Sequence, residues 1–197
     1  MKRRAGRASL GTSVVSAVLL SGCAGGHLGL ANSDIPSDLG LQSDPSAFNL
    51  VAGGAGLVEP ITVTKNTKCS LAFHGVFIPP GRSGEAAGGE GVTFTYPEVL
   101  TIEWQCPSTE IARMVFAERS SEASSEGARA VAEVADEATL LSVGNEPNQG
   151  YPADRVYIVG WREGEYFGGV QLVGPQGDEL VTPAVAESLA RREASDT

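Results

Sequence analysis

Few side chains in this chain have the chemistry of a nucleophile or a general base. Of the two histidines, His27 lies near the N-terminus, where no site could be preorganised. His74 alternates with Phe73 in an expected strand, so it should lie on the opposite, solvent-facing side. Residues 81–84 read Gly-Arg-Ser-Gly, which lacks the GxSxG spacing of a presented nucleophilic serine, and no HExxH metal motif occurs. We therefore expect neither a catalytic triad nor a metal site.

Carboxylates are the remaining candidates for chemistry, because 24 acidic residues always supply pairs. Glu98 and Glu103 flank one expected strand, and Asp136 and Glu137 are neighbours. Two carboxylates across a sugar ring are the machinery of glycoside hydrolysis. A cell-envelope hydrolase that uses paired carboxylates is thus the alternative function, although nothing singles out one pair. No dinucleotide or phosphate-loop fingerprint is present, and we expect no cofactor.

The most specific chemical signal is Cys23. It follows Leu20, Ser21 and Gly22, and it stands after a positive n-region and a short apolar stretch, residues 14–20. This arrangement resembles the bacterial lipoprotein box, whose cysteine thiol accepts a diacylglyceryl group. The apolar stretch is far short of the roughly 20 residues of a membrane-spanning helix. The sequence therefore predicts a cleaved signal peptide and a membrane anchor through the lipid on Cys23, on the extracytoplasmic face. The export route, Sec or twin-arginine, stays open.

Net charge excludes one large class of partners. The whole chain carries −10, and removal of residues 1–22 takes away four positive charges and no negative ones, which leaves −14. A nucleic-acid-binding protein needs a basic surface, so we expect no nucleic acid partner. Hydrophobic residues are 42% of the chain, enough for a packed core.

Cys69 and Cys106 are predicted to form a disulfide in an oxidising compartment. Around both cysteines the residues at alternate positions along the chain are apolar, so both thiols should point into a core. These apolar neighbours are Leu71 and Phe73 beside Cys69, and Leu100, Ile102 and Trp104 beside Cys106. The alternatives are two free thiols or a metal-binding pair.

Alternating patterns predict an antiparallel sheet. Strands are expected at residues 61–64, 69–78, 92–96, 99–106, 155–162 and 166–173, with a loop at 82–91. A helix should begin at 107–109, with an interruption at 120–127 and a continuation to about 138. Residues 138–143 could instead be a short strand. Thr182 and Pro183 open a terminal helix.

These elements define one domain of the α+β class, with five to seven antiparallel strands, two or three packed helices and one disulfide. The signal peptide is residues 1–22, and residues 23–46, rich in Gly, Ser, Pro and Asp, should form a flexible tether. The domain is residues 47–194, and residues 195–197 should fray.

The lipid box, the tether, the two cysteines and the helix after the second one resemble secreted actinobacterial lipoproteins of unknown function. So do residues 135–138, residues 162–164 between paired strands, and the final helix with Leu189 and Ala190. The layout is also similar to the extracellular sensor domain of some actinobacterial serine/threonine kinases. The resemblance implies an α+β fold and an extracytoplasmic location but assigns no chemistry.

The function expected from the sequence is therefore a lipid-anchored binding or sensing module without catalytic activity. Tyr157, Trp161 and His74 are the candidate binding residues, for an envelope protein or a small apolar ligand. Tyr157 and Trp161 would be exposed only if the sheet were covered on one face, and they would otherwise be core residues. A purely structural envelope partner is a third possibility. Ligand and oligomeric state do not follow from the sequence.

Overall fold

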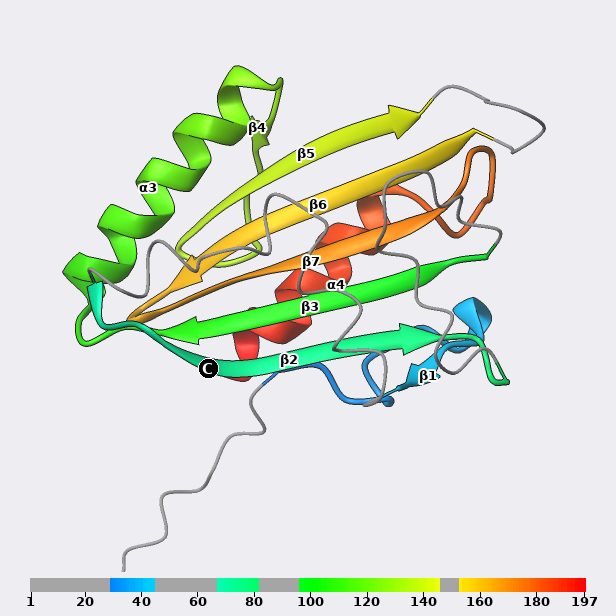
Figure 1. The fold of residues 1–197 in the computed structure, drawn as a ribbon, viewed down its shortest axis with the longest axis horizontal. Helices are drawn as coiled ribbons and strands as arrows, with labels where there is room; N and C mark the ends of the chain where they lie inside the picture. The colour runs from blue at the N-terminus through cyan, green and yellow to red at the C-terminus, as the bar shows by residue number, and fades with distance from the viewer. Residues whose placement is uncertain (1–28, 45–66, 82–95, 146–152) are drawn as a thin grey trace, which may run out of the picture.

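The sheet is the centre of the fold in the computed structural model, which describes residues 29–44, 67–81, 96–145 and 153–197. Seven strands run antiparallel to their neighbours in the order β1-β2-β3-β7-β6-β5-β4 (Figure 1). Their bounds are Gln42–Ser43 (β1), Ser70–Ile78 (β2), Glu98–Gln105 (β3), Arg129–Ala130 (β4), Glu137–Asn145 (β5), Asp154–Glu163 (β6) and Tyr166–Pro175 (β7). The predicted α+β class is confirmed. The strand expected at 61–64 and the loop at 82–91 lie outside the described residues. So does the strand expected at 92–96, except for Tyr96, which forms a bend.

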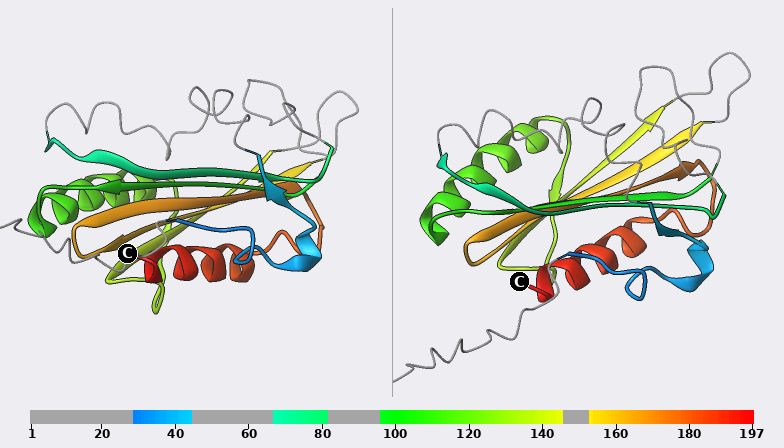
Figure 2. Two further views of the ribbon diagram at one scale, coloured as in Figure 1. Left: turned by 90° about the horizontal axis from the view of Figure 1, so that it is seen from below. Right: turned by 60° about the horizontal axis from the view of Figure 1, so that its bottom comes forward.

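Two helices pack on opposite faces of this sheet. Helix α3 is Thr109–Ser125 and helix α4 is Pro183–Ser195. Each begins with a hydroxyl cap of the expected kind: Ser108 Oγ accepts from the backbone N–H of the third helical residue, and Thr182 Oγ1 does the same in α4. Figure 2 shows α4 lying along one face of the sheet. We call this the α4 face, and the opposite side the α3 face.

The α4 face holds the main hydrophobic core. Alternate residues of the strands point at the helix, and Trp161, Val159 and Leu172 are fully buried there together with Leu189 of α4. Gly168 of β7 makes room for this arrangement, since a Cβ at that position would lie 2.7 Å from the Trp161 ring and 2.6 Å from a backbone carbonyl oxygen. Close packing of this kind leaves no space for even one added methyl group.

The α3 face carries two smaller clusters, one of them built around the disulfide. Cys69 and Cys106 are bonded, as predicted, and pack with Ala112 and Val115 of α3 and with Phe167. The bond fixes the start of β2 beside the start of α3.

The prediction of a flexible tether at residues 23–46 is wrong for residues 29–44. Residues 29–44 form a short 3-10 helix, Ser37–Leu39, and strand β1. Leu30, Ile35 and Leu39 are each at most 6% exposed and belong to the core beneath α4. The Gly, Ser and Pro content suggested a linker, but these apolar residues gain more from burial than the segment loses in chain freedom. Residues 23–28, 45 and 46 lie outside the described part.

The predicted break in the first helix is also wrong. Helix α3 continues to Ser125, because burial of Ala123 outweighs the weak helix preference of the serines around it. The hydroxyls of Ser124 and Ser125 donate to helix carbonyls in this last turn. The helix expected at 131–138 does not form either: Glu133 has a left-handed φ of 63°, and β5 begins at Glu137. The alternative, a strand at 138–143, is confirmed.

Candidate functional site

One row of the sheet lacks side chains at its centre. Ile102 of β3, Gly169 of β7, Gly160 of β6 and Thr139 of β5 are paired in register across four strands. A Cβ on Gly160 would point toward the ring of Phe116, so this row faces α3. The two central positions are glycines. The sheet therefore has a hollow where a normal row would present two side chains.

Helix α3 closes one side of this hollow and leaves the other open. Phe116, Arg119 and Ser120 line it from the helix, and Trp104 and Phe167 line it from the sheet. Its enclosed volume is about 40 Å³, and about 520 Å³ when the space out to the mouth is included. An added Cβ on Gly160 would make only ordinary contacts, 3.6 Å to Thr139 and 3.8 Å to Phe116. The enclosed part suits one small apolar group rather than a whole ligand.

Two polar atoms of the lining residues have no hydrogen-bond partner among the described residues. They are Nε1 of Trp104 and Oγ of Ser120, and both are shielded from solvent. A buried donor without a partner costs free energy, typically 1–3 kcal/mol. Such atoms in an open pocket favour a bound group that carries a hydrogen-bond acceptor.

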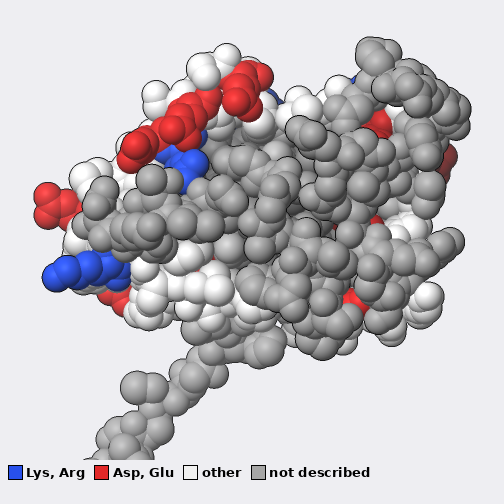
Figure 3. All heavy atoms as spheres, viewed as in Figure 1, with Lys and Arg blue, Asp and Glu red and all other residues white. Residues whose placement is uncertain are grey.

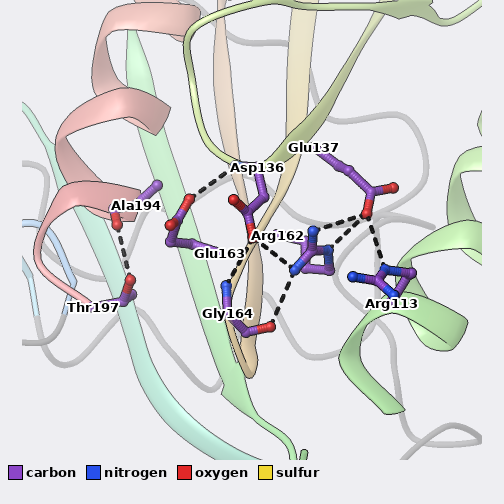
Figure 4. Close-up of polar contacts among 8 residues, drawn as sticks. All are labelled: Arg113, Asp136, Glu137, Arg162, Glu163, Gly164, Ala194 and Thr197. Atoms are coloured by element: carbon purple, nitrogen blue, oxygen red, sulfur yellow. Dashed lines mark hydrogen bonds and ion pairs between the residues drawn. The ribbon is translucent and has the colours of Figure 1, made fainter. Parts of the chain in front are cut away.

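An ion-pair network fixes the base of α3 beside this hollow. Arg162 of β6, only 3% exposed, donates from Nε to Glu137 Oε1 at 2.9 Å, and its Nη1 lies 3.0 Å from Asp136 Oδ2 (Figure 4). Glu137 in turn lies 3.8 Å from Arg113 of α3. The same Asp136 carboxylate accepts from the backbone N–H of Gly164 in the β6–β7 turn. The network therefore ties β5, the β6–β7 turn and α3 together.

The outer flank of α3 is acidic. Figure 3 shows acidic side chains running along this helix. Glu118, Glu122 and Glu126 are exposed at four-residue spacing, and we call them the acidic ridge. Arg119 lies between the ridge and the hollow, with Nη1 3.3 Å from Glu122 Oε2. Within the described part of the chain, Glu118 and Glu126 form no ion pair, so the flank carries unbalanced negative charge.

The three predicted binding residues do not form one site. Trp161 is 0% exposed beneath α4, so its role as a surface binding residue is corrected to a core role. Tyr157 lies on the same α4 face, half-buried against the core. His74 is exposed, but it pairs with Ile102 and so lies on the α3 face, where burial lowers its pKa. The sheet separates His74 from the two aromatic residues because they lie on its opposite faces.

A register shift in β2 explains part of this placement. Leu71 pairs with Trp104 but Phe73 pairs with Glu103, so one extra residue is inserted between them. Leu71 and Phe73 therefore lie on opposite faces, whereas simple alternation placed them together. His74 lies opposite Phe73 as predicted.

The carboxylates considered for hydrolysis have structural surroundings. Asp136 and Glu137 bind the Arg162 guanidinium, and Glu98 and Glu103 are both 0% exposed. None of the four lines the hollow. Among the described residues, no three His, Cys, Asp or Glu side chains are placed to hold a metal ion.

Cys23 lies outside the described residues, so its lipidation remains a prediction. In the part that the structure describes, no helix is both long enough and apolar enough to cross a membrane.

Comparison of the chain with protein-family models, curated proteins and solved structures gave no match. Inferences about its function therefore rest on the residues themselves.

Sequence reasoning missed the hollow although its residues were in view. Gly160 was assigned to the correct strand, and Ile102 and Trp104 to the correct face. The missing signal was the pairing of Gly160 with Gly169, which depends on the β6–β7 register. Pairing the two strands of the β6–β7 hairpin outward from the turn at Gly164 would have placed Gly160 beside Gly169.

Proposed function

We propose that this protein is a lipid-anchored, non-catalytic binding module on the outer side of the cell membrane. The observation that supports binding most directly is the hollow between the sheet and α3, which is lined by apolar residues and open on one side. The box at Cys23 supports the anchor. The disulfide suits an oxidising compartment outside the cytoplasm.

The surroundings of the hollow suggest the chemistry of the partner. The enclosed space of about 40 Å³ accepts one small apolar group, and a larger group such as a ring would extend into the open mouth. The acidic ridge beside it attracts positive charge. A partner molecule that carries an apolar group next to a cation would satisfy both features. Envelope proteins with a basic surface segment have this chemistry.

Three small probes of similar shape and different charge test this proposal: benzylammonium, benzyl alcohol and benzoate. The chain from residue 24 keeps every described residue, and its amide signals can be followed by NMR. We expect millimolar binding, with shifts at Gly160, Gly169 and the Trp104 indole N–H. Benzylammonium should bind about twofold or more tightly than benzoate at low salt, and the difference should shrink at high salt.

A blocking variant and a matched control make the test specific. Gly160→Val fills the hollow and should abolish the shifts, whereas Ala117→Val on the exposed side of α3 should not. If benzoate bound more tightly than benzylammonium, the proposal of a cationic partner would be contradicted. Unchanged probe binding in folded Gly160→Val would contradict the hollow as the site.

The anchor is tested separately. Lipid on Cys23 should make the native protein partition into a detergent phase, and Cys23→Ser should leave it unprocessed or released. A Ser variant that fractionates with membranes as the wild type does would rule out the lipid box.

A further inference from the structure

Two glutamates are buried between the sheet and the C-terminal turn of α4. Glu103 projects from β3 and Glu193 from α4, and both are 0% exposed. Asp196, the residue that caps α4, lies close enough to raise the pKa of both. Three carboxyl groups thus gather in one place, and no Lys or Arg in the described residues forms an ion pair with either glutamate.

Glu193 is held by two hydrogen-bond donors. Trp161 Nε1–H donates to its Oε2 at 2.8 Å, and the Thr101 hydroxyl bonds its Oε1. Burial raises the pKa of Glu193 well above its usual value, and the Trp161 bond offsets only part of this effect. Burial without a counter-ion therefore favours the protonated form of Glu193. A neutral carboxylic acid can still accept from Trp161.

Glu103 has no such support. Neither of its carboxylate oxygens has a well-aligned hydrogen-bond partner within the described residues, and a weak hydrogen bond with the Gly29 backbone lowers its pKa only in part. Burial and then the Asp196 charge raise this pKa to about 7. Glu103 therefore exchanges its proton close to neutral pH.

Among the described residues, no other element forms an ion pair with Glu103. The residues opposite Glu103 on β2 and β7 are Phe73 and Gly168, which cannot titrate. Tyr166 of β7 is the further titratable group nearby, and the Glu103 charge contributes to its raised pKa. An ionised Glu103 thus faces Asp196 without a counter-ion.

The last turn of α4 also holds the N-terminal segment. Arg192 Nη1 donates to the backbone oxygen of Asp34 at 2.6 Å, and Gly29 lies against Phe73 so closely that a Cβ would collide with its ring. Residues 29–44 therefore contact both the α4 terminus and β2.

From this geometry we infer that Glu103 and Glu193 form a proton-binding site that fastens the last turn of α4 and the N-terminal segment to the sheet. With the proton bound, the pair is neutral and can be buried without a counter-ion. When Glu103 loses its proton, repulsion from Asp196 and from the negative end of the α4 dipole displaces the turn. The segment held by Arg192 loosens with it. This inference does not depend on the proposed ligand or on the lipid anchor.

Trp161 provides a direct optical readout, because its indole contacts Glu193. The chain has two tryptophans, so Trp104→Phe leaves Trp161 as the sole source of tryptophan emission. The Trp104→Phe chain should show a change in tryptophan emission with a midpoint near pH 7. Hydrogen exchange of the peptide covering residues 193–197, corrected for the intrinsic effect of pH, should rise over the same range.

Three substitutions separate this site from a general effect of pH. Glu103→Gln keeps size and removes the charge, so it should abolish the transition and leave the turn docked. Asp196→Asn removes the repelling charge and should lower the midpoint. Glu118→Gln, on the exposed side of α3, should change neither.

A transition that persists unchanged in folded Glu103→Gln would overturn the inference. Exchange at residues 193–197 that stays constant from pH 5 to 9 in the wild type would also overturn it. The second measurement needs no variant, so the inference is tested even if a substitution prevents folding.

Discussion

The Arg162 network allows a quantitative test of how α3 is held in place. The guanidinium is 3% exposed, whereas its partners Asp136 and Glu137 are 48% and 40% exposed. The buried group is thus the cation alone. Removal of the cation and removal of its partners should therefore lower the free energy of unfolding by unequal amounts.

Arg162→Met takes away the buried charge and leaves two carboxylates that water can solvate. Its hydrogen bonds to Glu137 and the Gly164 carbonyl and its ion pair with Asp136 are lost, and methionine fills most of the space. We expect destabilisation of about 1–2 kcal/mol. Asp136→Asn with Glu137→Gln instead leaves the buried guanidinium without an anion, and this should cost about 3–5 kcal/mol.

Urea unfolding followed by circular dichroism measures both variants, and the triple variant completes the cycle. If the unpaired guanidinium causes the loss of stability, the triple variant should have nearly the same free energy of unfolding as Arg162→Met alone. The effects of the two sets of substitutions would then be strongly coupled. Arg129→Met serves as the control, because Arg129 is 58% exposed and its pair with Glu187 should contribute less than about 1 kcal/mol. If Arg162→Met destabilised the protein more than the double carboxylate variant, the unequal-burial reasoning would be refuted.

Local signals in the sequence predicted most of the described fold. Alternation located β2, β3, β6 and β7 to within one or two residues, and the caps Ser108 and Thr182 located both helix starts. These features depend on neighbours in the chain, so a single sequence contains them. The disulfide followed for the same reason, since Cys106 shares a face with its apolar neighbours.

The errors occurred where tertiary contacts outweigh local preference. Residues 29–44 look like a linker until Leu30 and Leu39 find the core beneath α4. The serine-rich end of α3 looks like a break until Ala123 packs on the sheet. Neither contact has a signal in its own segment.

The candidate sites needed long-range information of the same kind. The hollow exists because Gly160 and Gly169 pair in register, and the buried acid site exists because α4 places Glu193 near a β3 residue ninety positions away. Sequence alone offered Glu103 as one of many acidic residues. Its burial without a counter-ion distinguishes it, and only the fold shows that.

Three further outcomes follow from the structure. Replacing both Cys69 and Cys106 with serine should lower stability by about 4 kcal/mol in the loop-entropy model, since the bond spans 37 positions; urea unfolding with and without reductant measures this. The pKa of Glu103 is about 7 in the folded protein, whereas the ordinary value, expected in the unfolded chain, is 4.5. Between these two pH values the folded protein keeps a proton that the unfolded chain has lost. Stability should therefore fall as pH rises from about 5 to 7, by at most about 3 kcal/mol, and Glu103→Gln should flatten this slope. The last outcome separates two glycines that look alike in the sequence. A methyl group on Gly168 would lie under 3 Å from an indole ring and a backbone oxygen, whereas one on Gly160 would meet nothing closer than 3.6 Å. Ala at position 168 should thus cost about 1–3 kcal/mol through overpacking, while Gly160→Ala should be neutral or stabilising, because alanine restricts the unfolded chain and fits the hollow. Thermal unfolding of the two variants decides this, and equal losses at both positions would mean that the hollow is not open in solution.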